Sequence, residues 1–231
     1  VAMNVLARRV GSWVGRWLRQ PHHRHGASLP TRQDFLEKSL QPGDVLLVEG
    51  ETRISVAIKY LTQSTWSHAA LFIGDAAARN GTGDSRLCFV EADIIDGVRL
   101  VELSEFAGLH CRICRPVGLT DADRRRIIDY GLARVGQHYD LKNVFDLARY
   151  LIPTPPVPQR WRRRMLSLGS GDPTRAICST LIAQCFQSVR YPILPSVELR
   201  ATDSDDCPGC IDELLRIRHH SLFVPRDFDV S

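Results

Sequence analysis

The chain has 231 residues, of which 44% are hydrophobic and 24% are charged, and it carries a net charge of +4. This length suits a single domain with a substantial hydrophobic core. No run of about 18 apolar residues occurs, which excludes a membrane-spanning helix. The basic N-terminus is not followed by the apolar stretch of a cleavable secretory signal, so the expected location is cytoplasmic.

Positive charge is concentrated in two segments of the chain. Residues 1–25 contain five arginines and no acidic residue, and residues 149–175 contain six arginines and one aspartate. Each segment carries +5, so the remaining residues, out of a total of +4, carry −6. Two basic appendages on an acidic body are atypical of nucleic-acid-binding domains, whose basic charge lies along the folded surface. No nucleic-acid partner is expected.

Residues 1–26 are expected to form an amphipathic basic helix and a linker. Within residues 3–19, apolar side chains recur at steps of three and four, and most arginines lie off that face. Trp13 and Trp17 beside several arginines are typical of a helix at an anionic membrane surface, which would make the protein peripheral on the inner membrane face. The alternative is a helix that packs on the body of the protein. Pro21 is expected to end it.

Residues 31–231 are expected to form one domain that is rich in short strands. Apolar runs separated by turn residues predict a strand at 45–48, a helix at 54–62, strands at 67–73, 87–93, 98–102 and 110–115, and helices at 120–135 and 177–189. Asp96-Gly97 predicts a tight hairpin turn, because glycine accepts a positive φ. Four prolines between residues 152 and 158 exclude a helix or a central strand there. Residues 151–175 are therefore expected to be a Pro/Arg-rich insertion.

Cys178 lies at the start of the helix predicted over residues 177–189. The helix dipole and the unpaired amides at such a position favour negative charge, which lowers the pKa of a thiol. The same amides can donate hydrogen bonds to an oxyanion. Cys178 is therefore a candidate nucleophile. The alternative is a small side chain that is buried at the helix start.

His68 begins an otherwise apolar strand and is either a core histidine or a general base. Glu91 interrupts the next apolar strand, where a carboxylate is costly unless it is paired. Neighbouring strands would bring Glu91 within reach of the imidazole. Asp93 shares the face of Glu91 and is the alternate orienting carboxylate. A thiol, an imidazole and a carboxylate are the groups that cysteine hydrolysis requires.

The remaining cysteines suggest a metal site that strand geometry disfavours. The chain has seven cysteines, an odd number that argues against a complete disulfide framework. Cys111 with Cys114, and Cys207 with Cys210, form two C-x-x-C pairs that are typical of structural zinc sites. Residues 110–115 are predicted as a strand, however, where positions three apart face opposite sides. We expect no metal and no cofactor, leave the role of Cys207 and Cys210 open, and expect Cys185 to pack in the core.

Two parts of the sequence resemble the NlpC-type papain-like cysteine peptidases. Gly136–Asp140 followed by Ile177–Ile182 is similar to their G-x-x-Y … C-S-x-L-I/V half, and Pro42–Leu46 followed by Ser67–Gly74 is similar to their P-G-D … S/T-H half. The histidine half comes first here. This circularly permuted order resembles the YiiX/YebB-like permuted hydrolases, which are related to the lecithin–retinol acyltransferase group. Phe223–Asp229 resembles a C-terminal segment of that branch.

The resemblance implies an α+β fold. It is circularly permuted and papain-like (NlpC-type), with a small antiparallel sheet or barrel packed against helices. The resemblance also implies that Cys178 is the nucleophile, that His68 is the general base and that Glu91 orients the imidazole. Tyr139 matches a tyrosine that lies near the nucleophile in the family.

The reaction that the resemblance implies is hydrolysis of an amide or ester bond through a thioester intermediate. Tyr139, Ser67 and Ser179 are expected to contact a small peptide or acyl substrate. A cell-wall peptide amide follows from the NlpC-type relatives, whereas lipid-directed acyl transfer or thioester hydrolysis at a membrane follows from the acyltransferase relatives. The third alternative is a non-catalytic membrane- or partner-binding protein on the same scaffold. The oligomeric state is left open.

Overall fold

The structure is a computed structural model, and it describes residues 20, 28–81, 84–93, 96–138, 177–201 and 211–231. Several predictions concern residues outside these ranges: the helix at 3–19, Tyr139, the insertion at 151–175, and Cys207 with Cys210.

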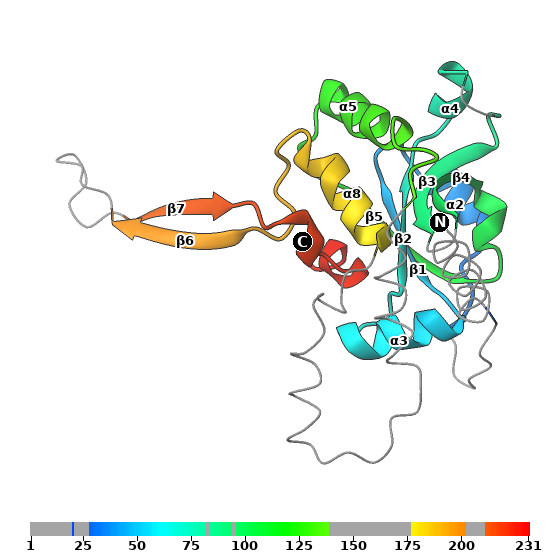
Figure 1. The fold of residues 1–231 in the computed structure, drawn as a ribbon, viewed down its shortest axis with the longest axis horizontal. Helices are drawn as coiled ribbons and strands as arrows, with labels where there is room; N and C mark the ends of the chain where they lie inside the picture. The colour runs from blue at the N-terminus through cyan, green and yellow to red at the C-terminus, as the bar shows by residue number, and fades with distance from the viewer. Residues whose placement is uncertain (1–19, 21–27, 82–83, 94–95, 139–176, 202–210) are drawn as a thin grey trace, which may run out of the picture.

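The centre of the fold is a five-stranded antiparallel sheet in the order β4-β3-β2-β1-β5 (Figure 1). Its strands are β1 (Val45–Glu49), β2 (His68–Phe72), β3 (Leu87–Asp93), β4 (Gly97–Glu102) and β5 (His110–Cys114). All five lie where the apolar runs predict strands. The sheet and the helices that pack on it confirm the expected α+β class.

Three of the described helices were predicted and two were not. The described helices are α2 (Gln33–Ser39), α3 (Arg53–Thr62), α4 (Ala76–Arg79), α5 (Asp121–Leu132) and α8 (Ile177–Gln187). Helices α3, α5 and α8 match the predicted ones. Helix α5 begins where the sequence places an acidic first turn, and the Thr120 side chain accepts a hydrogen bond from the Asp123 N–H at 3.1 Å. None of the described helices is both long and apolar enough to cross a membrane.

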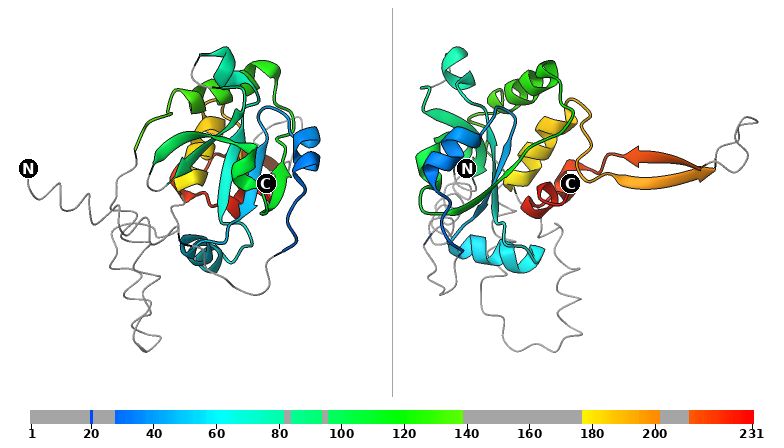
Figure 2. Two further views of the ribbon diagram at one scale, coloured as in Figure 1. Left: turned by 90° about the vertical axis from the view of Figure 1, so that its right-hand side faces the viewer. Right: turned by 180° about the vertical axis from the view of Figure 1, so that it is seen from behind.

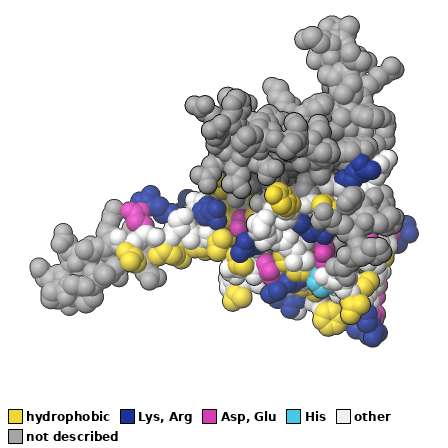
Figure 3. All heavy atoms as spheres, turned by 90° about the horizontal axis from the view of Figure 1, so that it is seen from below, with side chains coloured by type: hydrophobic (Ala, Val, Ile, Leu, Met, Phe, Trp, Pro, Cys, Tyr) yellow, Lys and Arg dark blue, Asp and Glu magenta, His cyan; other side chains and the backbone are white. Residues whose placement is uncertain are grey.

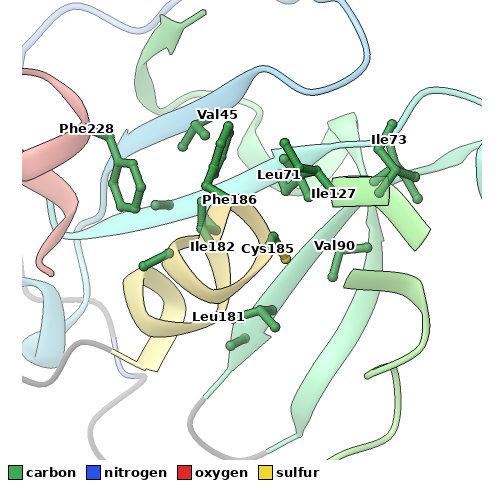
Figure 4. Close-up of a cluster of buried hydrophobic side chains, with 14 of the residues drawn as sticks. Val45, Leu71, Ile73, Val90, Ile127, Leu181, Ile182, Cys185, Phe186 and Phe228 are labelled. Carbon is green, nitrogen blue, oxygen red and sulfur yellow. The ribbon is translucent and has the colours of Figure 1, made fainter. Parts of the chain in front are cut away.

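Helices and turns cover both faces of the sheet (Figures 1 and 2). On one face α8 packs on β2, β3 and α5, and the C-terminal 3-10 turns η2 (His220–Leu222) and η3 (Pro225–Phe228) contact α8 and β1. The side chains of this larger core meet between α8 and the sheet (Figure 4), and they include Leu71, Val90, Ile127, Leu181, Ile182, Cys185 and Phe186. On the other face, a smaller core lies beneath α2 and the 3-10 turn η1 (Leu103–Phe106).

The structure contains the β3–β4 hairpin that Asp96-Gly97 predicts, with Gly97 paired to Asp93. Gly97 has a φ of 72°, which a residue with a Cβ atom adopts at a cost. A Cβ at this position would also clash with the carbonyl oxygen of Gln137. That oxygen accepts the Val98 N–H at 2.8 Å, and the Gly136 N–H donates to the Val98 carbonyl at 2.8 Å. The segment that follows α5 is therefore held against β4.

Two carboxylates, the buried Asp44 and the partly buried Asp229, hold the segments that resemble family motifs against the rest of the fold. Asp44, in the Pro-Gly-Asp turn, accepts hydrogen bonds from Arg115 Nε at 2.9 Å and from the Gln41 N–H at 2.8 Å. Asp229, near the C-terminus, accepts from the Trp66 indole at 2.9 Å and pairs with Arg112 at 2.7 Å. These contacts give the two motif segments a structural role.

A two-stranded hairpin, which the sequence analysis did not predict, projects from the body (Figure 1). It pairs β6 (Ser196–Ala201) with β7 (Ile211–Arg216). Val197, Leu199 and Leu215 are exposed, and Figure 3 shows apolar side chains along one side of this arm. Glu198 pairs with Arg216. Since Val197 and Leu215 are directly opposed, the hairpin has an apolar face.

Candidate active site

His68 and Cys178 come from elements that meet at one end of the sheet. His68 is the first residue of β2, and Cys178 is the second residue of α8, which packs across β2 and β3 (Figure 1). Cys178 is 5% exposed. Its thiol and the His68 imidazole are hydrogen-bond partners. Helix α8 therefore places the Cys178 thiol beside the start of β2.

The second nitrogen of the His68 ring is bound to Glu91 on β3. Nε2 of His68 lies 2.7 Å from Oε2 of Glu91, whose side chain is 5% exposed, whereas that of His68 is 26% exposed. This contact leaves Nδ1 for the thiol. Asp93, the alternate carboxylate, accepts the Asp96 N–H of the hairpin turn at 2.9 Å. The structure thus brings Cys178, His68 and Glu91 into one chain of contacts.

The other oxygen of Glu91 is bound by Arg99, which lies directly opposite on β4. Arg99 Nε and Nη2 lie 2.8 Å and 2.7 Å from Oε1 of Glu91. The Arg99 side chain is 34% exposed and also approaches Glu105 at 3.9 Å and Asp96 at 4.0 Å. Each oxygen of the buried carboxylate therefore has its own partner.

The backbone of β2 also takes part in the site. Ile73 donates its N–H to Cys88 on β3, so odd-numbered residues of this antiparallel strand direct their N–H groups toward β3. The two strands pair at the end of β2 that is far from His68. Nearer to His68, the Ala69 N–H is a hydrogen-bond partner of the Cys178 sulfur. A strand amide on the β3 side of β2 is thus directed at the thiol.

These contacts favour transfer of the thiol proton to the imidazole. Burial raises the pKa of the Cys178 thiol, but the charge and hydrogen bond of His68 and the Ala69 amide outweigh it, so the pKa lies below its usual value. Burial lowers the pKa of His68, but the charges of Glu91 and Cys178 raise it well above its usual value. Burial likewise raises the pKa of Glu91, yet His68 and Arg99 lower it to about 2. These shifts act in the direction of a thiolate–imidazolium pair beside an ionised carboxylate.

One family model matches part of the chain. Residues 39–150 match the family model described as permuted papain-like amidase enzyme, YaeF/YiiX, C92 family. The matched segment contains His68 and Glu91 and ends before Cys178. This match supports a YiiX-like permuted papain-like hydrolase. The matched family is one of amidases, which supports a cysteine hydrolase of amide bonds. No curated protein matched the sequence.

The other described cysteines of the hydrolase have different environments. Burial raises the pKa of Cys185 to about 12 and the pKa values of Cys111 and Cys114 to about 11, and it also raises the pKa of Cys88. Cys185 packs in the larger core, as expected. Among the five cysteines that the structure describes, Cys178 alone has a lowered pKa.

Cys111 and Cys114 of the hydrolase lie on β5 and contact different cores. Cys111 belongs to the smaller core beneath α2, and Cys114 packs against the larger core on the opposite face of the sheet. They cannot share one metal ion, as their spacing in a strand predicts. Within the described ranges, no group of three or more His, Cys, Asp or Glu side chains is arranged to hold a metal.

The structure describes two of the three residues that are expected to contact substrate. The Ser67 hydroxyl is buried, accepts the Gly50 N–H at 2.9 Å and lies 3.4 Å from the Val48 carbonyl oxygen. Ser179 is buried, with its hydroxyl 4.0 Å from the Cys178 sulfur. Tyr139 lies outside the described residues. Substrate contact by these residues remains a prediction.

Sequence reasoning missed Arg99 and the Ala69 amide. Arg99 interrupts the apolar run of β4 just as Glu91 interrupts that of β3, so the same signal could have identified it. The register of β3 with β4 places Arg99 directly opposite Glu91. The Ala69 contact depends on where β2 and β3 stop pairing, for which the sequence carries no comparable signal.

Proposed function

We propose that this protein hydrolyses an amide bond through a thioester on Cys178, with His68 as the proton carrier and Glu91 as the residue that orients it. The observation that carries this proposal is the continuous chain of contacts from the Cys178 thiol through His68 to the buried carboxylate of Glu91. A thiolate is the nucleophilic form of cysteine, and a neighbouring imidazolium is the acid that a departing amine needs.

In the first half of the proposed reaction, the Cys178 thiolate attacks the carbonyl carbon of the substrate. A C–S bond forms, and the electron pair of the C=O bond moves onto the oxygen. His68 then donates its proton to the amine nitrogen as the C–N bond breaks, which leaves a thioester and neutral His68. Throughout these steps, Glu91 accepts a hydrogen bond from Nε2–H and keeps Nδ1 directed at the sulfur.

In the second half, water hydrolyses the thioester. Neutral His68 removes a proton from the water as the water oxygen attacks the thioester carbon. The C–S bond then breaks, a carboxylic acid leaves, and the thiolate–imidazolium pair is restored. The backbone amides of the first turn of α8 are the proposed donors to both oxyanions, because the first amides of an α-helix have no partner within the helix and Cys178 is the second residue of α8.

A hydroxylamine trapping experiment tests this proposal. Wild-type protein is incubated with matched peptide amides and acyl esters in the presence of hydroxylamine, which intercepts thioesters as hydroxamates. We expect turnover of amides with hydroxamate formation, because both water and hydroxylamine attack the acylated Cys178. Turnover that persists in Cys178→Ala would overturn the proposal. Turnover of esters alone would favour the lipid-directed alternative over the peptide substrate.

We also propose that residues 3–19 bind anionic membrane surfaces. Trp13, Trp17 and the five arginines of residues 1–25 support this, since each cation near an anionic surface contributes about 1 kcal/mol. Deleting residues 1–26 is expected to reduce sedimentation with anionic vesicles by at least about tenfold. Zwitterionic vesicles serve as the control. Equal partitioning of both proteins onto anionic vesicles would contradict the proposal.

A further inference from the structure

Arg99 is the fourth side chain in the chain of contacts that starts at Cys178. It lies on β4, directly across from Glu91 on β3. Both of its contacting nitrogens, Nε at 2.8 Å and Nη2 at 2.7 Å, approach Oε1 of Glu91. Oε2 is thereby left to His68 at 2.7 Å. The guanidinium and the imidazole therefore divide the two carboxylate oxygens between them.

This division restricts how the carboxylate of Glu91 can move. A carboxylate with two equivalent oxygens can rotate and present either one to a single partner. The fork of Arg99 anchors Oε1 through two donors, and charge-assisted bonds of this kind are stronger than neutral ones. The cross-strand register holds the guanidinium in place. Oε2 is consequently kept pointing at the His68 ring.

We propose that Arg99 is a positioning residue, which acts through Glu91 to keep His68 aligned with the Cys178 thiol; this inference rests on the proposed function. Arg99 is 34% exposed and Glu91 is 5% exposed, so the guanidinium lies between the buried carboxylate and solvent. Its cation keeps Glu91 ionised whichever form His68 takes during the reaction. A solely structural ion pair would stabilise the fold without changing the proton affinity of the thiol.

Arg99 and His68 each face other charged or titratable groups. Arg99 faces Glu91 from β3, Asp96 from the hairpin turn at 4.0 Å and Glu105 from η1 at 3.9 Å. His68 faces Glu91 and the Cys178 thiol. Asp96 and Glu105 are more distant and more exposed than Glu91, so their effect on His68 is screened by water.

The test is the pH dependence of Cys178 alkylation by iodoacetamide, with mass mapping of the labelled residue. In Arg99→Met we expect the acid limb to move up by about one pH unit, which makes the reaction roughly tenfold slower at pH values below both acid limbs. The limiting rate at high pH should stay within about twofold, because the sulfur itself is unchanged. The acid limb of Arg99→Lys should lie between those of wild type and Arg99→Met, since lysine keeps the positive charge but lacks the forked donors of the guanidinium.

Arg86→Met is the matched control. Arg86 pairs with Asp84 at 3.0 Å and with Glu102 at 3.7 Å, at the end of the same hairpin away from His68. We expect its acid limb to coincide with that of wild type. Thermal unfolding of every variant separates a loss of fold from a loss of alignment.

The outcomes distinguish the two proposals. A folded Arg99→Met protein with the wild-type acid limb would overturn the positioning role of Arg99. If Arg99→Met does not fold, unchanged acid limbs in Arg99→Lys and Arg99→Gln would overturn it instead. A wild-type Cys178 that alkylates with the pH dependence of an ordinary thiol would overturn the proposed function, whatever the Arg99 variants show.

Discussion

Replacing Cys178 by alanine is expected to lower kcat/KM for amide hydrolysis by at least about 10⁴-fold, the scale of loss when a covalent nucleophile is removed. The substitution removes the only described thiol with a lowered pKa. The measurement is kcat/KM on an amide that the wild-type protein turns over. Loss of one buried sulfur should change the unfolding free energy by only about 1 kcal/mol.

Cys88→Ala is the control for this prediction. Cys88 is half-buried on β3, and burial raises the pKa of its thiol, so its removal should leave activity within about twofold. Activity that survives in Cys178→Ala but is lost in Cys88→Ala would show that the nucleophile has been assigned to the wrong residue.

Replacing Glu91 by glutamine is expected to lower kcat/KM by about 10² to 10⁴-fold. Glutamine has nearly the same shape but has no charge, and its amide can present a donor where Nε2–H of His68 needs an acceptor. It also leaves the Arg99 cation without its closest partner. The experiment is the full pH profile of kcat/KM for wild type and variant. Asp93→Asn is the control, because Asp93 serves the hairpin turn.

The shape of that pH profile follows from the directions of the pKa shifts. The active pair exists above the lowered pKa of Cys178 and below the raised pKa of His68, so wild type should show a broad plateau between these limits. Without the Glu91 charge, the pKa of His68 falls and the alkaline limb moves to lower pH. A less stable imidazolium also raises the pKa of Cys178, so the acid limb moves to higher pH. Unchanged limbs in Glu91→Gln would contradict the assigned role of Glu91.

The sheet and most of the site could be predicted because local signals and long-range contacts agree. Apolar alternation located β1 to β5, and the Asp96-Gly97 turn fixed the register of β3 with β4. Polar residues inside apolar strands marked His68 and Glu91, since such groups are retained in a core only with partners. The position of Cys178 at a predicted helix start identified it as the third member of the candidate site.

The parts that could not be predicted depend on contacts between distant segments. Helix α2 is only seven residues long, and a single buried leucine, Leu36, anchors it to the smaller core. The β6–β7 hairpin exposes Val197, Leu199 and Leu215, so burial does not explain why its residues form strands. The choice of Glu91 over Asp93 was also left open, because period-two alternation places both carboxylates on one face.

The most direct test of the Cys178–His68 pair is limiting iodoacetamide labelling at pH 6 with mass mapping, on the wild-type protein and on His68→Ala. The structure predicts that Cys178 is labelled first in wild type, because His68 lowers the pKa of its thiol whereas burial raises the pKa values of the described core thiols. It also predicts that Cys178 loses this advantage when the imidazole is removed. Labelling of other cysteines ahead of Cys178, or a Cys178 rate that is the same with and without His68, would contradict the central claim.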